Sequence, residues 1–200
     1  SLATVPNIST DEAALLALKS HISFGPNNIL ARNWSSSGLV CSSIGITCSS
    51  RGHHRVTALN ISSMQLHGTI PPHLGNLSFL TSIDINNNTF YRELPEELAH
   101  LQRLKLIDLE LLNLSFNRFS GEIPASIGAL QKLEYLWLDS NQLYGTIPSA
   151  IANVSSLIHL STGDNNLQGL IPATIGSLSS LQVISLSRNQ LSGVVPASFF

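Results

Sequence analysis

Leucines and other apolar residues recur along most of the chain with a period of 24 residues. Six segments share the order L-x-x-L-x-L-x-x-N-x-L-x-G-x-I-P. They begin at Val56, Leu80, Leu109, Leu133, Leu157 and Leu181. The L-x-L step places two apolar side chains on one side of a short strand and the residue between them on the other. We therefore expect parallel strands near residues 57–62, 81–86, 110–115, 134–139, 158–163 and 182–187.

The other repeat positions have physical roles that fit a coiled chain. The asparagine is expected to turn inward and satisfy backbone groups of its own and the neighbouring coil. The glycine permits a turn that other residues resist, and the proline suits the start of a short convex helix. The asparagines are Asn88, Asn117, Asn141, Asn165 and Asn189, and the glycines are Gly68, Gly121, Gly145, Gly169 and Gly193. This is the pattern of a leucine-rich repeat, which predicts a right-handed α/β solenoid with a parallel sheet on its concave face.

Three residues depart from the repeat order. Met64 stands at the first asparagine position, and Thr162 replaces a core leucine in the fifth repeat. Arg92 replaces the glycine of the second repeat, so we expect a looser turn there.

The third repeat can be placed in two registers, because residues 104–117 hold two overlapping sets of leucines. A start at Leu104 puts Leu112 at the asparagine position and Phe116 at the glycine position. A start at Leu109 satisfies every position and makes the second repeat 29 residues long. The extra residues then lengthen a convex helix within 95–108. The rival interpretation, in which residues 110–114 bulge from the sheet, stays open.

Residues 1–55 do not repeat, and we expect them to cap the first coil, with residues 56–200 forming six repeats of which the last is truncated. A helix over 9–22 would present one apolar face to the solenoid. That face carries Ala14, Leu15, Leu18 and Ile22, and the N-cap candidates are Ser9, Thr10 and Asp11. Trp34 and the loop between Cys41 and Cys48 would complete the cap.

Cysteines and sequons indicate an oxidising secretory compartment. Cys41 and Cys48 enclose six residues, a loop short enough to close with a disulfide. Two cysteines alone do not separate a secreted protein from a cytosolic one. Seven N-x-Ser/Thr sequons supply the further signal, at Asn7, Asn33, Asn60, Asn76, Asn87, Asn113 and Asn153.

Composition excludes several classes of function. Only 11% of residues are charged and the net charge is −2, which gives no electrostatic case for nucleic acid or an acidic membrane surface. No apolar run reaches the roughly 18 residues of a membrane span. The first ten residues lack the features of a signal peptide, which is therefore absent or already removed.

The N-terminal motifs resemble one family. DEAALLALKSHI, followed by NW at 33–34 and CSSIGITC at 41–48, looks like the cap of plant leucine-rich-repeat receptor kinases, and the GxIP signature resembles their repeat class. Ser43 and Ile46 stand where that family commonly has tryptophan and valine. Within the family the chain resembles the group containing the rice bacterial-blight receptor. The resemblance implies a secreted, glycosylated, ligand-sensing ectodomain, with a membrane span, a Ser/Thr kinase and a co-receptor of the same repeat type as expected companions.

No catalytic or cofactor motif is present. Phosphate-binding, metalloprotease and serine-hydrolase patterns are missing. His53 and His54 are better explained as a solvated pair than as metal ligands, because no further ligands follow at metal spacing. Asp139 and Asp164 fall at or just past strand ends and are expected to point to solvent. We interpret the chain as non-catalytic, with no cofactor.

Three functions fit such a solenoid. The first is a receptor ectodomain that binds a peptide or microbial pattern, and the second is a free-standing secreted inhibitor of a pathogen's cell-wall hydrolase. The third is an adhesion or ice-binding scaffold, for which the exposed positions are too mixed. The last coil would present Ile184, Leu186 and Leu191 to water, so we expect the solenoid to continue and favour the receptor.

The outward strand positions predict where a ligand binds. The central ones are Asn60, Asp84, Asn113, Trp137, Ser161 and Ser185, flanked by Phe116, Tyr135, Asp139, His159 and Arg188. Tyr135 and Trp137 give the strongest signal, since exposed aromatic residues anchor interfaces. They could instead pack on each other or beneath a glycan. Glycans on Asn60 and Asn113 would obstruct the N-terminal part of this face and leave repeats four to six for the ligand.

Overall fold

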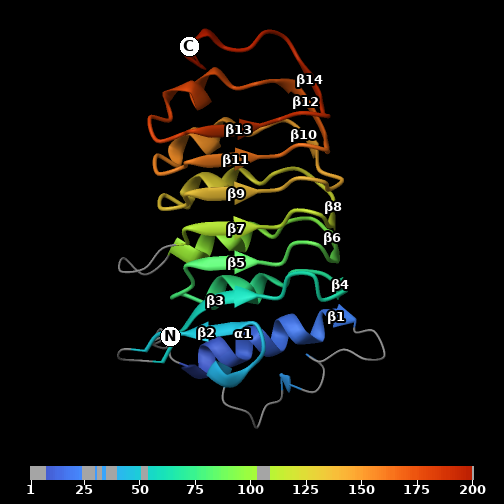
Figure 1. Ribbon diagram of the computed structural model, residues 1–200, viewed down its shortest axis with the longest axis vertical. Coiled ribbons are helices and arrows are strands. Elements are labelled where there is room, and N and C mark those ends of the chain that lie inside the picture. Colours follow the sequence, from blue (N-terminus) through green and yellow to red (C-terminus); the bar gives the residue numbers. More distant parts are fainter. Residues whose placement is uncertain are drawn as a thin grey trace, which may run out of the picture.

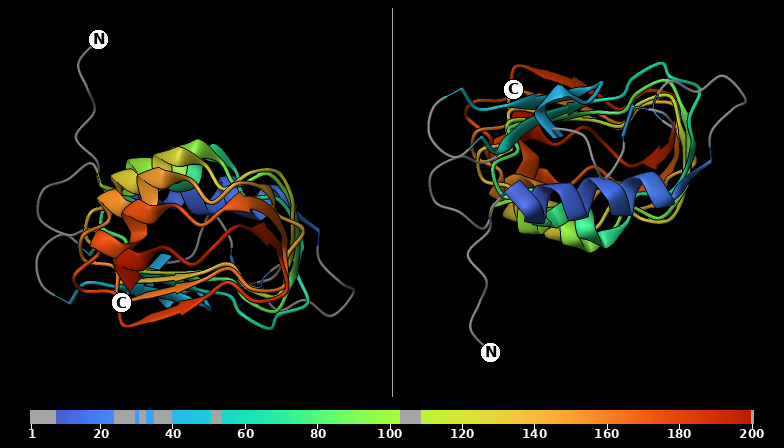
Figure 2. Two further views of the ribbon diagram at one scale, coloured as in Figure 1. Left: turned by 90° about the horizontal axis from the view of Figure 1, so that it is seen from above. Right: turned by 90° about the horizontal axis from the view of Figure 1, so that it is seen from below.

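Figure 1 shows the computed structural model, in which the chain winds into coils stacked along one axis, with a helix across the N-terminal end. The structure describes residues 8–23, 30, 33–34, 40–50, 54–102 and 109–199. The predicted fold class, a solenoid of leucine-rich repeats, is confirmed. Figure 2 shows the main sheet and the short convex helices on opposite sides of the stack.

The concave face is a seven-stranded sheet that takes one parallel strand from each repeat. These strands are β3 (Val56–Asn60), β5 (Ser82–Asp84), β7 (Leu111–Asn113), β9 (Tyr135–Trp137), β11 (His159–Ser161) and β13 (Val183–Ser185). The cap adds β2 (Ile46–Cys48), which pairs with β3 in the antiparallel direction. Most strands have three residues, not the six predicted, because the chain turns inward directly after the L-x-L step.

Pairing in the main sheet decides the register of the third repeat. β7 lies between β5 and β9, with Leu112 opposite Ile83 and Leu136 and no irregularity on either side. The register that starts at Leu109 is therefore confirmed, and the bulge at 110–114 is wrong. Leu104 and the predicted lengthening over 103–108 lie outside the described residues.

Two smaller sheets form the side of the solenoid that follows the asparagine turns. One contains β1 (Ile22–Ser23), β4 (His67–Gly68), β6 (Thr89–Arg92) and β8 (Arg118–Phe119), and the other β10 (Tyr144–Gly145), β12 (Asn166–Leu170) and β14 (Gln190–Ser192). The convex helices are 3-10 helices at Pro72–Asn76, Glu96–Gln102, Ala125–Ala129, Ser149–Asn153, Ala173–Ser177 and Ala197–Phe199. In the long second repeat this helix has seven residues, where those of the repeats on either side have five.

The repeat asparagines turn inward, as predicted. Asn117 donates from Nδ2 to the carbonyls of Ile85, Leu114 and Ser115 at 3.1, 3.2 and 3.1 Å, and its Oδ1 accepts the N–H of Phe90 at 3.0 Å. Each such side chain ties its own coil to the preceding one, so the polar ladder and the leucine core act together.

Arg92 does not open its turn, contrary to the expectation. Its φ is +69°, close to the +77° to +82° of the glycines at the same position in later repeats. Gly68 differs, because its φ lies outside the left-handed region and β1 pairs closely beside it, with Ile22 opposite Gly68. A Cβ added there would lie 2.2 Å from the carbonyl oxygen of His21, so the residue is needed for that close approach.

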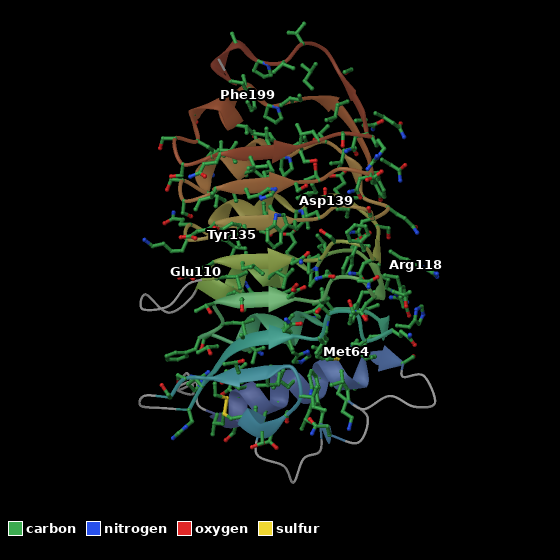
Figure 3. All side chains as sticks on the ribbon, in the orientation of Figure 1. Met64, Glu110, Arg118, Tyr135, Asp139 and Phe199 are labelled. Carbon is green, nitrogen blue, oxygen red and sulfur yellow. A yellow bond between two sulfur atoms is a disulfide. The ribbon has the colours of Figure 1, made fainter. Side chains whose placement is uncertain are left out.

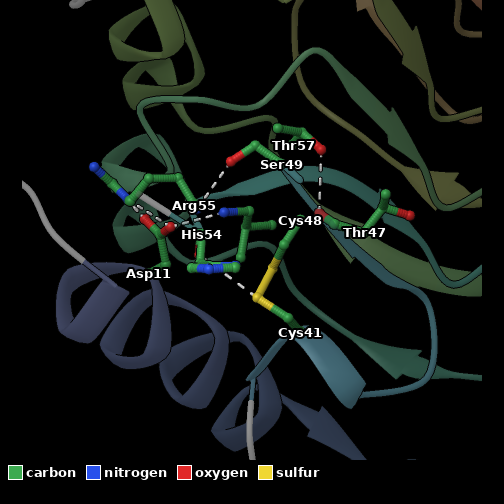
Figure 4. Close-up of a disulfide and its surroundings, with 9 residues drawn as sticks. Asp11, Cys41, Thr47, Cys48, Ser49, His54, Arg55 and Thr57 are labelled. Atoms are coloured by element: carbon green, nitrogen blue, oxygen red, sulfur yellow. Dashed lines mark hydrogen bonds and ion pairs between the residues drawn. A yellow bond between two sulfur atoms is a disulfide. The ribbon is translucent and has the colours of Figure 1, made fainter. Parts of the chain in front are cut away.

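The cap covers the first coil through α1 (Ile8–Ser20), which buries Ala14, Leu15 and Leu18. The helix ends earlier than predicted, and Ile22 is buried in β1 instead. The predicted disulfide joins Cys41 to Cys48 (Figure 4), and the Trp34 indole N–H donates to the carbonyl of Ile44 at 2.9 Å.

Asp11, offered as an N-cap, instead lies inside α1 and forms a buried ion pair. Its carboxylate accepts two guanidinium N–H bonds from Arg55, at 2.6 and 2.8 Å, and the backbone N–H of Val56 at 2.9 Å (Figure 4). Arg55 also donates to Ser78 Oγ at 3.1 Å and lies 4.5 Å from the centre of the Phe79 ring. This cluster fastens the cap to the first repeats.

Candidate functional site

The outward residues of successive strands lie in rows across the concave sheet. Asn113, Trp137 and Ser161 are directly opposite one another in β7, β9 and β11. Tyr135 and Trp137 lie on the same side of β9 with ring centroids 5.6 Å apart, and the edge of His159 meets Trp137 at 5.5 Å. The three rings are all half-buried and form one continuous aromatic cluster.

A shallow hollow of about 310 Å³ lies beside this cluster. It is lined by Asn86, Asn113, Ser115, Phe116, Trp137, Asp139, His159 and Ser161. Six of the outward residues predicted to bind the ligand line this hollow: Asn113, Phe116, Trp137, Asp139, His159 and Ser161. Tyr135 does not line it but contacts Trp137, which does. Phe116 projects beside it with 58% of its surface exposed. In Figure 3, Tyr135 lies at the start of β9 and Asp139 lies beyond the other end of the strand.

Asp139 does not point freely to solvent, which corrects the expectation. Its Oδ1 accepts hydrogen bonds from the Ser161 hydroxyl and, at 3.0 Å, from the Gly163 N–H. Its Oδ2 accepts the Ser115 hydroxyl at 3.3 Å. The carboxylate therefore links repeats three, four and five and is held in one place at the wall of the hollow.

Arg188 does not line the hollow, and its guanidinium forms an ion pair elsewhere on the face. Its guanidinium donates to both carboxylate oxygens of Asp164, the residue at the same position one repeat earlier. Hydrogen bonding to Arg188 lowers the pKa of Asp164 and raises the pKa of Arg188 from their ordinary values. Asp164 faces solvent, as expected, but it does so within this exposed ion pair.

The hollow includes residues that the repeat pattern did not single out. Asn86 and Ser115 occupy the repeat position of Asp139, four residues after the strand's first outward position, and the period itself could have identified them. A larger hollow of about 540 Å³ lies beside the first repeats, between Pro71 and Arg92. It has no Phe, Tyr or Trp in its lining, so it offers no comparable anchor.

The sequons differ in accessibility. Asn60, Asn76, Asn87 and Asn153 are exposed, Asn33 and Asn113 are half-buried, and Asn7 lies outside the described residues. Asn113 lines the hollow itself, so a glycan there would cover the aromatic cluster and not only the N-terminal part of the face. A glycan on Asn113 would therefore also obstruct repeats four and five, which were expected to stay free for the ligand.

Metal ligands do not cluster in the described ranges, where no three His, Cys, Asp or Glu side chains gather as a metal site. His54 is exposed, and His53 falls outside these ranges. No helix in the part of the chain that the structure describes is both long and apolar enough to span a membrane.

Family models match most of the chain. The Leucine rich repeat N-terminal domain matches residues 8–49, and the Leucine Rich Repeat matches 55–77, 79–101, 108–130, 132–154 and 180–200. The chain belongs to the leucine-rich-repeat family. The repeat around Thr162 is not among the matched segments, in line with its departure from the consensus.

Its relatives include plant receptor kinases. The chain is 38% identical over 96 residues to the LRR receptor-like serine/threonine-protein kinase EFR of Arabidopsis thaliana, covering 48% of this chain and 9% of EFR. It is 43% identical over 85 residues to the receptor kinase-like protein Xa21 of Oryza sativa subsp. japonica, covering 40% of this chain and 8% of Xa21. The chain thus spans about a tenth or less of these relatives.

Solved structures agree with these relatives. PEPR1, in its crystal structure with AtPEP1, superposes with a TM-score of 0.87 at 32% identity, over 96% of this chain and 26% of PEPR1. The resemblance to plant leucine-rich-repeat receptor kinases is therefore confirmed. The matched fold is a non-catalytic repeat domain.

Proposed function

We propose that this chain is the extracellular ligand-sensing part of a plant leucine-rich-repeat receptor kinase. It binds a peptide or microbial pattern on the concave face, at the hollow beside Trp137, and signals with a co-receptor and a kinase domain. Support comes from relatives named as receptor kinases and from a superposable neighbour solved with its ligand AtPEP1. The chain would lie on the outer face of the plasma membrane. The disulfide and the exposed sequons suit this location, because the secretory pathway is oxidising and glycosylates such asparagines.

One observation carries the location of the site. Tyr135, Trp137 and His159 contact one another from adjacent strands and remain only half-buried, and Trp137 and His159 line the open hollow. Partly accessible aromatic residues of this kind supply large contact area in protein interfaces. The row geometry suits an extended segment lying across several repeats, so that neighbouring residues contact neighbouring coils.

A random twelve-residue peptide library displayed on yeast tests this site while the natural ligand is unidentified. Selected peptides should lose at least tenfold in affinity for the Trp137→Ala and Tyr135→Ala variants, about 1.4 kcal/mol. Tyr144→Ala is the matched control, because Tyr144 is 50% exposed on the side sheet and outside the hollow. Selected peptides that bind every variant equally well would move the site elsewhere.

Glycosylation supplies an independent check, because a glycan on Asn113 would fill the proposed site. We expect glycopeptide mass spectrometry of the secreted protein to find Asn113 unmodified and the exposed Asn76 and Asn153, at the ends of convex helices, occupied. High occupancy at Asn113 would rule out ligand binding at this hollow.

A further inference from the structure

We propose that the hollow beside Trp137 is a seat for a cationic side chain, so that the ligand is a basic peptide segment presenting an arginine or a lysine. This inference rests on the proposed function and names the chemistry of its ligand. It follows from three features of the described face: its charges, its rings and the free hydrogen-bonding capacity of Asp139.

The charged side chains on the concave face are mostly negative. The outward repeat positions carry five carboxylates, on Asp84, Glu110, Glu134, Asp139 and Asp164. Arg188 is the one Lys or Arg at these positions among the described residues, and Asp164 already neutralises it. No ion pair within 4 Å reaches the other four carboxylates in the described part of the chain. The face therefore attracts positive charge, and an anionic ligand would be repelled.

Aromatic rings surround the position where such a charge would sit. Phe116 and Trp137 line the hollow, and the electron-rich face of an indole ring is the strongest side-chain partner for a cation. His159 meets Trp137 at an interplanar angle of 89°, and the contact holds the indole in place. A guanidinium group suits this site best, because it stacks on a ring and donates in its own plane.

Asp139 provides the counter-charge at the wall of the same hollow. A carboxylate has about four acceptor positions, and Asp139 uses three, two on Oδ1 and one on Oδ2. Oδ2 therefore keeps capacity for one N–H donor. The molecule contains the same combination in its cap, where Arg55 pairs with the Asp11 carboxylate and lies over the Phe79 ring.

A neutral oligosaccharide is the main competing ligand, since sugar rings also stack on exposed indoles. Such a ligand would make use of Trp137 but would leave the charge of Asp139 without a partner. The two ligands can therefore be separated by their dependence on charge.

The test uses the fluorescence of Trp137. The chain has two tryptophans, and Trp34 is 3% exposed, so a small ligand on the concave face perturbs Trp137 selectively. We expect N-acetyl-arginine amide to give a saturable signal at low ionic strength that weakens as salt is added. N-acetyl-citrulline amide has nearly the same shape without the charge, and should bind at least about fivefold more weakly.

Two matched variants test whether the Asp139 carboxylate is the group that binds the cation. Asp139→Asn should weaken binding of the arginine amide about fivefold or more, whereas Asp164→Asn, on the same face but already paired, should change it little. Equal binding of arginine and citrulline amides by the unmodified chain would overturn the inference, and this comparison does not depend on how well a variant folds. Saturable binding of cellohexaose that Asp139→Asn leaves unchanged would favour the oligosaccharide and overturn it too.

The peptide selection separates failure of this inference from failure of the proposed function. Selected peptides that depend on Trp137 and are enriched in arginine or lysine support both. Peptides that depend on Trp137 without such enrichment retain the proposed site and overturn its cationic specificity. Peptides that do not depend on Trp137 overturn both.

Discussion

Replacing Asp11 with alanine leaves the Arg55 guanidinium buried between cap and solenoid without its counter-charge. Arg55 is 1% exposed and Asp11 0%, so water cannot take the place of the carboxylate. Breaking a buried pair in this way costs about 3–5 kcal/mol of the free energy of unfolding. The Ser78 hydroxyl and the Phe79 ring remain as partners of Arg55, so we expect a loss near the lower end, about 3 kcal/mol.

Urea unfolding followed by circular dichroism, with the disulfide intact, measures this loss. The Asp11→Leu, Arg55→Met double variant removes both charges and should recover most of the stability, because no charge is left stranded. Asp164→Ala breaks an exposed pair and should shift the unfolding midpoint far less. A loss below about 1 kcal/mol for Asp11→Ala, or a double variant as unstable as the single one, would refute the reasoning.

Three further substitutions test other parts of the fold. Thr162→Val should stabilise the protein by about 1 kcal/mol in the same assay, because the buried Thr162 hydroxyl has no hydrogen-bond partner among the described residues. Asn117→Ala should destabilise it by about 2–3 kcal/mol, since the buried N–H of Phe90 and three carbonyls lose their partner. Arg188→Gln should raise the pKa of Asp164 towards its ordinary value in a carboxyl NMR titration. In the unmodified protein, the stability that the pair contributes is fully present above the ordinary pKa of Asp164 and is lost as pH falls through its lowered pKa.

Much of the candidate site could be predicted because the repeat has a strict period. With Leu109 as the start of the third repeat, every outward residue has a known row, and Trp137 and His159 fall on adjacent strands. The same frame could not tell that Arg188 would bond Asp164 rather than reach the hollow. That choice depends on side-chain reach between coils, which residue types do not specify.

The sequence by itself determined the coil, because each repeat position has one physical task and the same tasks recur every 24 residues. Contacts between distant segments were decided only in the tertiary structure. Asp11 and Arg55 are 44 residues apart and belong to no shared pattern, yet the packing of α1 against the first coil brings them together where no water can reach. Asp139 likewise becomes a fixed carboxylate only because stacking places it between Ser115 and Ser161. The repeat period determines whether a side chain faces the core or the solvent. Its hydrogen-bond partners depend on which residues the neighbouring coils place next to it.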